Sequence, residues 1–167
     1  MDGYLGNLNE SAEFISERIG TKPQIGIILG SGLGPIVNEL ENTTEIDYSS
    51  IPNFPVTTVE GHAGTLISGE IKGKRVLALK GRFHHYEGYD VSQVVFPIRV
   101  MKLLGIDNLL VTNAAGGINK NFKPGDLVVI KDHISFFAPS PLRGENYNEF
   151  GARFPDMSRA YSRELIE

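Results

Sequence analysis

The sequence predicts an α/β fold in which a mixed central sheet is flanked by helices. Two compact apolar runs, at residues 25–29 and 109–112, are each followed at once by a turn of small residues, which is typical of buried strands in such sheets. A third apolar stretch, residues 65–80, is interrupted by Lys72-Gly73-Lys74 and predicts a hairpin. The antiparallel strands of the hairpin make the sheet mixed rather than purely parallel.

The first predicted helix lies near the N-terminus. Apolar residues recur at three- and four-residue spacing between Leu8 and Ile19, and Gly20 supplies a stop. Residues 36–40 predict a second helical segment, because Pro35 is suited to the first turn of a helix.

A third helix is predicted before Gly105. Asp90 and Gln93 form a helix-start pair, and a largely apolar stretch follows them. Pro97 lies inside this stretch and should kink the helix or delay its start.

The remainder of the chain predicts one strand and much loop. Residues 127–134 form an apolar run that predicts a further buried strand, and residues 137–155 are rich in Pro, Gly, Asn and Arg, which predicts a long loop. Residues 156–167 predict the start of a helix. We expect residues 1–167 to form a single α/β domain.

Composition argues against several classes of protein. A net charge of −4 and the absence of Trp disfavour a nucleic-acid partner. The chain has no cysteine, so neither disulfides nor thiolate chemistry are expected. The N-terminal residues do not form a signal peptide, and no apolar run approaches the ~20 residues that cross a bilayer. We therefore expect a cytoplasmic protein without a membrane partner.

The first candidate site is the loop at residues 30–34, Gly-Ser-Gly-Leu-Gly, which follows a predicted strand. Glycines bring backbone N–H groups close to an anion, and Ser31 adds a hydroxyl donor. The loop lacks the Gly-Lys-Ser/Thr of a Walker A motif, and its spacing is not that of the dinucleotide fingerprint. A tight turn without a ligand explains this motif alone equally well.

The second candidate site is residues 81–89, Gly-Arg-Phe-His-His-Tyr-Glu-Gly-Tyr. Arg82 offers a planar fork of donors that suits phosphate, and a neighbouring histidine can donate to the same anion. The alternatives are a solvated loop and a metal site formed by His84, His85 and Glu87. Adjacent histidines point apart, so the metal site is disfavoured and no metal is expected.

Two further loops carry candidate residues. His62 lies between two glycines within residues 60–64, where either a gate near a ligand or plain exposure is consistent with the sequence. Residues 113–117, Asn-Ala-Ala-Gly-Gly, follow a predicted strand. Their small side chains would let a ligand approach the backbone, and a plain turn explains this motif alone equally well. Together the four loops suit the binding of inorganic phosphate beside a hydroxylated ligand and do not suit covalent catalysis.

The order of these motifs resembles that of the trimeric purine nucleoside phosphorylases. The resemblance runs from about Pro23 to Ser158. The motifs that carry it are, in chain order, GSGLG, IPNFP, EGHAG, GRFHHYEGY, FPIRV, TNAAGG, GDLVVIKDHI, PLRG and RFPDMS. The resemblance implies a three-layer α/β/α fold and the reversible phosphorolysis of purine nucleosides such as inosine and guanosine, with phosphate as co-substrate and no cofactor.

The resemblance also implies roles for individual residues. Phosphate would be held by Ser31, Arg82, His84 and the backbone of Ala114. Glu87 would support His84 in the catalytic group.

The nucleoside side of the site is implied in the same way. His62 would lie near the ribose and its 5′ hydroxyl as part of the catalytic group. The nucleoside would be contacted by Tyr86, His62, Ala114, Ala115, Gly116 and Phe154. Phe154 would cover the sugar in a neighbouring subunit's site, so the resemblance implies a homotrimer.

Members of this family continue through a further C-terminal third that contains the purine-selecting residues. We therefore expect this chain to be the N-terminal portion of such a domain, with little or no activity alone, and its sequence does not choose between 6-oxopurines and adenosine. A non-catalytic Rossmann-like nucleotide- or phosphate-binding fragment is the alternative. That alternative needs an acidic residue at the end of a second strand, whereas Glu45 and Asp47 lie in a segment that does not predict a buried strand. A fragment that serves only in assembly, or that folds poorly, is a third reading.

Overall fold

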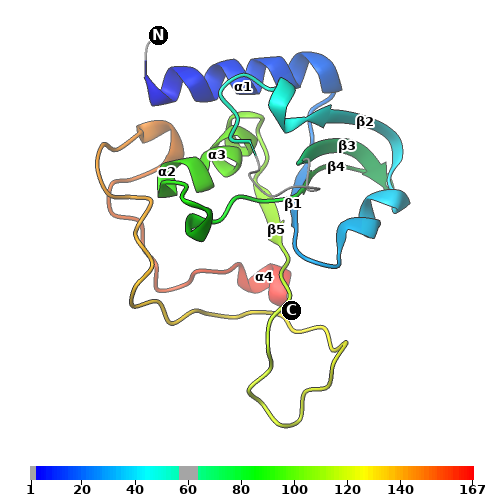
Figure 1. Cartoon of the computed structure of the whole chain (residues 1–167), viewed down its shortest axis with the longest axis vertical. Coiled ribbons are helices and arrows are strands. Elements are labelled where there is room, and N and C mark those ends of the chain that lie inside the picture. Colours follow the sequence, from blue (N-terminus) through cyan, green and yellow to red (C-terminus); the bar gives the residue numbers. More distant parts are fainter. Residues whose placement is uncertain (1–2, 57–63) are drawn as a thin grey trace. The chain divides into compact units, whose positions relative to one another are not determined.

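The computed structural model describes residues 3–56 and 64–167, and the chain divides into two compact units, Met1–Ala114 and Ala115–Glu167. The first unit contains the sheet (Figure 1). Its elements, in chain order, are α1 (Tyr4–Ile19), β1 (Ile25–Leu29), the 3-10 helix η1 (Gly34–Glu39), β2 (Glu41–Asp47), η2 (Tyr48–Ser50), β3 (Thr65–Ile71), β4 (Lys74–Lys80), η3 (His85–Glu87), α2 (Val91–Val94), α3 (Phe96–Leu103) and β5 (Asn108–Val111).

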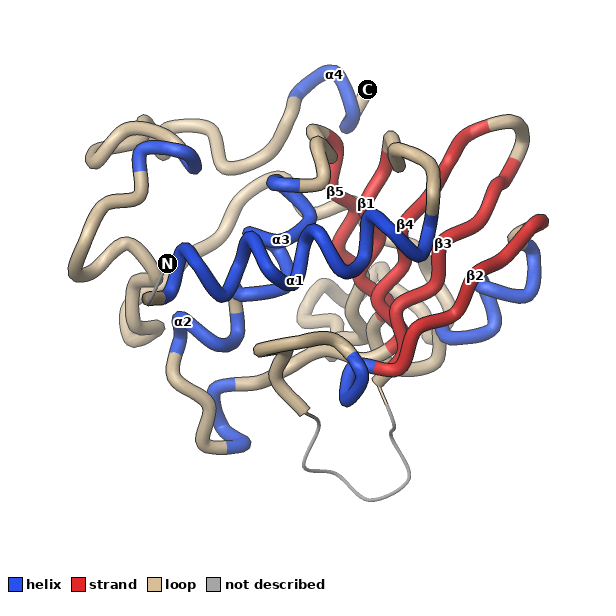
Figure 2. The backbone as a smooth tube through the Cα atoms, turned by 90° about the horizontal axis from the view of Figure 1, so that it is seen from above, coloured by secondary structure: helices blue, strands red, loops and turns tan. Residues whose placement is uncertain are grey.

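The sheet is mixed, as the sequence predicts, and its strands lie in the order β2-β3-β4-β1-β5 (Figure 2). β4, β1 and β5 are parallel to one another, whereas β3 is antiparallel to both β2 and β4. The predicted hairpin is confirmed. At its turn Lys72 and Gly73 have φ angles of 48° and 72°, the left-handed pair that a two-residue turn between twisted strands requires.

Elements of the first unit pack on both faces of the sheet. On one face Val37 of η1 packs into an apolar cluster with Ala78 of β4 and its neighbours. On the other face α3 approaches β1 so closely that a Cβ on Gly26 would lie 2.9 Å from the sulfur of Met101. α1 in turn packs against α3 (Figure 1).

The helix signals in the sequence have the predicted effects. α1 ends at Gly20, whose φ of 61° is left-handed and whose N–H donates to the carbonyl of Ser16. Asp90 and Gln93 form a capping box at the start of α2. The helix is interrupted after Val94 and resumes as α3 with Pro97 in its first turn, so the predicted kink is present.

Two strand predictions need correction. β5 forms where predicted but is not buried: Leu110 and Val111 are both more than half exposed, because β5 is the edge strand of the sheet. Residues 127–134 do not form a strand. A strand needs neighbouring backbone to pair its N–H and C=O groups, and these residues have no such ladder within the described part of the chain.

The second unit consists mostly of irregular backbone. Its helical elements are η4 (Asn148–Phe150) and α4 (Arg163–Ile166). The predicted loop over residues 137–155 is therefore interrupted only by η4, and α4 lies within the predicted helical segment. None of the described helices is both long and apolar enough to cross a membrane.

Candidate functional site

The carboxyl ends of three parallel strands bring three of the predicted loops to one edge of the sheet. Leu29 at the end of β1 is paired with Lys80 at the end of β4, and Ile28 is paired with Val111 at the end of β5. The loops that begin at Gly30, Gly81 and Thr112 therefore start side by side. Ligands in open α/β sheets bind at this position, outside the carboxyl ends of the strands.

The glycine loop lies directly against the chain that follows β5. The N–H of Gly30 donates to Oγ1 of Thr112 over 2.9 Å. A Cβ on Gly30 would lie only 2.4 Å from the carbonyl oxygen of Thr112, so this close approach of two backbones requires glycine. Ser31 and Gly32 are exposed beyond this contact. Gly30 thus has a packing role, and the serine remains accessible.

In the extended chain after β4, the apolar side chain of Phe83 lies between two polar ones, Arg82 and His84. Phe83 is almost fully buried, and its ring contacts Tyr48, Phe54 and Tyr89 with centroid separations of 5.5, 6.3 and 5.5 Å. Successive side chains of an extended segment point to opposite sides. Because Phe83 is anchored in this aromatic cluster, Arg82 and His84 point away from the cluster, toward the carboxyl ends of the parallel strands.

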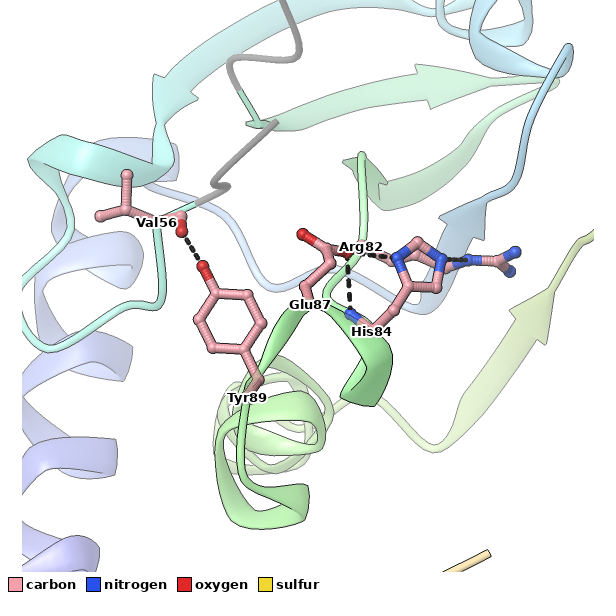
Figure 3. A network of polar contacts seen from close by, with 5 residues as sticks. All are labelled: Val56, Arg82, His84, Glu87 and Tyr89. Atoms are coloured by element: carbon pink, nitrogen blue, oxygen red, sulfur yellow. Dashed lines mark hydrogen bonds and ion pairs between the residues drawn. The ribbon is translucent and has the colours of Figure 1, made fainter. Parts of the chain in front are cut away.

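The guanidinium of Arg82 is fixed by two acceptors. Its Nε donates to Nε2 of His84 over 3.0 Å (Figure 3). Its Nη1 donates to the carbonyl oxygen of Thr112 over 3.0 Å. A guanidinium has five N–H donors, so this arrangement orients the group and still leaves it donors for an anion.

The imidazole of His84 is held from several sides. Oε1 of Glu87 lies 2.5 Å from Nδ1 of His84 and also accepts its backbone N–H over 3.2 Å, which closes a capping box on η3 (Figure 3). The ring of Tyr86 stacks on the imidazole at 4.7 Å. Because Nδ1 donates to a carboxylate and Nε2 accepts from Arg82, this network fits the neutral tautomer protonated at Nδ1.

A buried tyrosine supports the start of the same loop. The hydroxyl of Tyr48 donates to the carbonyl of Gly81 over 2.8 Å, and its backbone N–H donates to the carbonyl of Gly64 over 3.0 Å. Burial raises the pKa of the Tyr48 phenol well above its ordinary value, so the hydroxyl stays protonated and keeps donating. Tyr48 could not be predicted as a supporting residue, because a tyrosine before an apolar segment carries no distinctive signal.

The second histidine of the pair is directed elsewhere. Nδ1 of His85 lies 2.8 Å from the carbonyl of Tyr89, and the hydroxyl of Tyr89 donates to the carbonyl of Val56 (Figure 3). His85 therefore does not join His84 and Glu87. Across residues 3–56 and 64–167, no group of three or more His, Cys, Asp or Glu side chains could hold a metal ion.

The other predicted site residues lie in different parts of the chain. His62 lies outside the described residues. Tyr86 is 83% exposed beside His84. Ala114 ends the first unit, and its carbonyl accepts a hydrogen bond from the Asn113 side chain over 3.3 Å. Ala115, Gly116 and Phe154 belong to the second unit, where the Phe154 side chain is 88% exposed.

The chain is an α/β protein in which a fixed arginine and histidine lie beside an accessible glycine loop at the carboxyl ends of parallel strands, an arrangement that suits an anion. The chain belongs to the Phosphorylase superfamily, whose family model matches residues 24–167.

The curated relatives are similar over nearly the whole chain. Purine nucleoside phosphorylase 1 of Geobacillus stearothermophilus is 55% identical over 158 residues, which cover 95% of this chain and 58% of that protein. Purine nucleoside phosphorylase of Bos taurus is 49% identical over 159 residues, with 93% and 55% covered. The chain thus spans less than three fifths of the length of these relatives, and the resemblance to the N-terminal portion of purine nucleoside phosphorylases is confirmed.

Solved structures agree in fold. Isoform 2 of purine nucleoside phosphorylase from Schistosoma mansoni, in complex with cytosine and ribose-1-phosphate, has a TM-score of 0.89 at 49% identity and covers 96% of this chain and 57% of that one. A purine nucleoside phosphorylase in complex with ribose-1-phosphate has a TM-score of 0.91 at 47% identity, with 97% and 61% covered. These neighbours confirm the predicted nucleoside phosphorylase-like α/β fold.

Proposed function

We propose that this chain supplies the phosphate- and ribose-binding part of a purine nucleoside phosphorylase. The reaction is the reversible conversion of a purine ribonucleoside or deoxyribonucleoside and phosphate to the free base and the pentose 1-phosphate. The observation that carries this proposal is the guanidinium of Arg82, held by Thr112 and His84 where the three loops begin.

The geometry suits a reaction in which the enzyme binds both reactants noncovalently and forms no covalent intermediate with them. The glycosidic bond breaks with its electron pair leaving on the purine nitrogen, and an oxygen of phosphate forms the new bond to the anomeric carbon from the opposite face. Positive charge develops on the ribosyl group, so a positioned phosphate anion stabilises the transition state. A fixed arginine holds the anion in place without giving up a proton to it, because the guanidinium stays charged.

On the phosphate side we assign Arg82, His84, the hydroxyl of Ser31 and the backbone of Ala114. His84 in its present network accepts at Nε2, so it can donate to phosphate only when Nε2 carries a proton and the contact with Arg82 is released. Glu87 orients the ring for this role through its contact with Nδ1.

On the nucleoside side we assign Tyr86 to the ribose, His62 to the region of the 5′ hydroxyl, and Ala114, Ala115 and Gly116 to backbone contacts. The exposed ring of Tyr86 is consistent with a role as a surface for a ligand. We assign Phe154 to a neighbouring subunit's site in a homotrimer, and the exposure of its side chain is consistent with this assignment.

The substrate class is supported by what related proteins bind. A purine nucleoside phosphorylase from Schistosoma has been solved with hypoxanthine, and one from Schistosoma mansoni with adenosine, each at 45% identity and a TM-score of 0.90. We propose purine nucleosides such as inosine and guanosine as the substrates, with inorganic phosphate as co-substrate and no cofactor. Inosine, guanosine and adenosine should be compared directly in one assay.

The Rossmann-like alternative is not favoured. The segment around Glu45 and Asp47 forms a strand, β2, but its side chains are mostly exposed, so it is not a buried strand. In addition, β2 is antiparallel to β3 and lies at the far edge of the sheet from β5. A dinucleotide-binding unit needs its acidic residue at the end of a parallel strand next to the glycine loop.

The proposal is tested by Arg82→Ala in the protein that carries this chain. Loss of charge-assisted hydrogen bonds to phosphate should raise the phosphate KM by roughly 10- to 100-fold, measured as release of hypoxanthine from inosine. Arg75→Ala is the matched control, because Arg75 pairs with Glu70 at the opposite end of the hairpin strands, and it should leave the phosphate KM unchanged.

Phosphate-dependent thermal stabilisation provides a second readout. It is useful because we predict that the 167 residues alone turn over little nucleoside. An unchanged phosphate response in Arg82→Ala by both readouts would remove Arg82 from the site. Stabilisation by a nicotinamide or flavin dinucleotide instead of phosphate with inosine would favour the Rossmann-like alternative.

A further inference from the structure

Thr112, the residue directly after β5, contacts both neighbouring loops. Its Oγ1 accepts the N–H of Gly30 over 2.9 Å and donates to the carbonyl of Ile28 over 3.0 Å. Its own carbonyl accepts Nη1 of Arg82 over 3.0 Å. One residue therefore joins the start of the glycine loop to the guanidinium that follows β4.

The side chain at this position needs a hydroxyl. A hydroxyl group can accept one hydrogen bond and donate another at the same time, and Thr112 does both within the strand-end contact. The carbonyl of Ile28 also accepts the backbone N–H of Thr112 over 3.0 Å, so this oxygen remains paired without the hydroxyl. The N–H of Gly30 has no such second contact among the described residues. Removal of Oγ1 should therefore release the glycine loop selectively.

The same contact fixes how closely the two loops approach. The backbone of Gly30 lies so near the carbonyl of Thr112 that a Cβ there would be 2.4 Å from its oxygen. That oxygen is also the acceptor for Arg82. The separation between the loop of Ser31 and the guanidinium thus depends on one carbonyl and one hydroxyl of a single residue.

We propose that Thr112 is a positioning residue for the phosphate site. Its hydroxyl fixes the glycine loop, its carbonyl fixes Arg82, and together they set the spacing of the donors on the two sides of the anion. This inference rests on the proposed function and adds a residue that contacts the anion-binding groups rather than the anion.

The test compares variants at one position. Thr112→Val keeps the shape of the side chain and removes the hydroxyl, so the phosphate KM should rise by about tenfold while the inosine KM stays within about twofold. Thr112→Ser keeps the hydroxyl and should restore the phosphate KM. Val111→Ala is the matched control, because this neighbouring side chain is exposed on the edge strand and should change neither constant.

The outcomes separate this inference from the proposed function. If Arg82→Ala raises the phosphate KM and Thr112→Val does not, Thr112 is not a positioning residue and the proposed function stands. If neither variant changes the phosphate KM, the proposed function fails as well. Equal rises in the phosphate and inosine KM for Thr112→Val would show a general structural role and overturn the inference.

A further variant covers the case in which Thr112→Val does not fold. Thr112→Cys has a similar size and only a weak donor and acceptor, so its phosphate KM should lie between those of the wild type and Thr112→Ala. A phosphate KM for Thr112→Cys that equals the wild-type value, with Thr112→Ala also unchanged, would overturn the inference.

Discussion

Two apolar runs of similar composition have different structures in this chain. Residues 25–29, Ile-Gly-Ile-Ile-Leu, form β1, which is paired on one side with β4 and on the other with β5. Residues 127–130, Leu-Val-Val-Ile, form no strand, and all four side chains are exposed, Leu127 almost completely so. The difference shows that β-branched and apolar residues favour a strand but that neighbouring strands are needed to form it.

The same contrast applies to the two units taken separately. The first unit contains all five strands and the buried apolar residues of the described chain. The second unit contains two short helical elements, and its apolar side chains are largely exposed. Stability measured on the chain should therefore report on the first unit.

The largest expected effect is the difference in stability loss between two leucine variants, one in each unit. Leu77 of β4 is fully buried, so Leu77→Ala should lower the free energy of unfolding by about 2–5 kcal/mol through lost burial and a new cavity. Leu127 is 95% exposed, and Leu127→Ala should change the free energy of unfolding by no more than about 0.5 kcal/mol. Urea unfolding of both variants measures this difference. Equal losses would mean that residues 127–130 are packed like a strand.

A smaller effect is expected from the tyrosine beneath the loop after β4. Tyr48→Phe removes the hydrogen bond to the carbonyl of Gly81 and should lower the free energy of unfolding by about 1 kcal/mol at neutral pH. The variant keeps the aromatic packing against Phe54 and Phe83, so the loss should remain small.

The pH dependence of this variant sharpens the same prediction. Burial raises the folded-state pKa of Tyr48 above the unfolded value of about 10, so the unfolded chain loses this proton first as pH rises. The contribution of Tyr48 to stability is present below pH 10 and should fall above it by about 1.4 kcal/mol per pH unit. Tyr48→Phe should lack this part of the alkaline loss. Parallel stability curves for the wild type and the variant above pH 10 would contradict the assignment.

Much of the first unit follows from local chemistry that the sequence displays. The glycine after α1, the Lys72-Gly73 turn and the Asp90–Gln93 capping box each act within a few residues, so they could be predicted without knowledge of the rest of the fold. The convergence of three loops could also be predicted, because consecutive parallel strands end at one edge of a sheet.

Other features depend on distant partners and could not be predicted in this way. Thr112 contacts residues more than 80 positions earlier in the chain, and nothing in its neighbours distinguishes it from any threonine at the end of a strand. β2 has mostly exposed side chains and lacks the apolar run that indicates a buried strand, so its pairing with β3 was missed. The exposure of β5 likewise reflects its place at the edge of the sheet.

The proposed function depends on a single anion site shared by the loops after β1 and β4. The most direct measurement is a crystal structure of the protein that carries this chain, determined with phosphate and a nucleoside. We predict one phosphate ion in contact with both the guanidinium of Arg82 and the hydroxyl of Ser31, with the ribose on its open side. A structure in which these two groups face different surfaces, or in which phosphate binds without either of them, would contradict the proposed function.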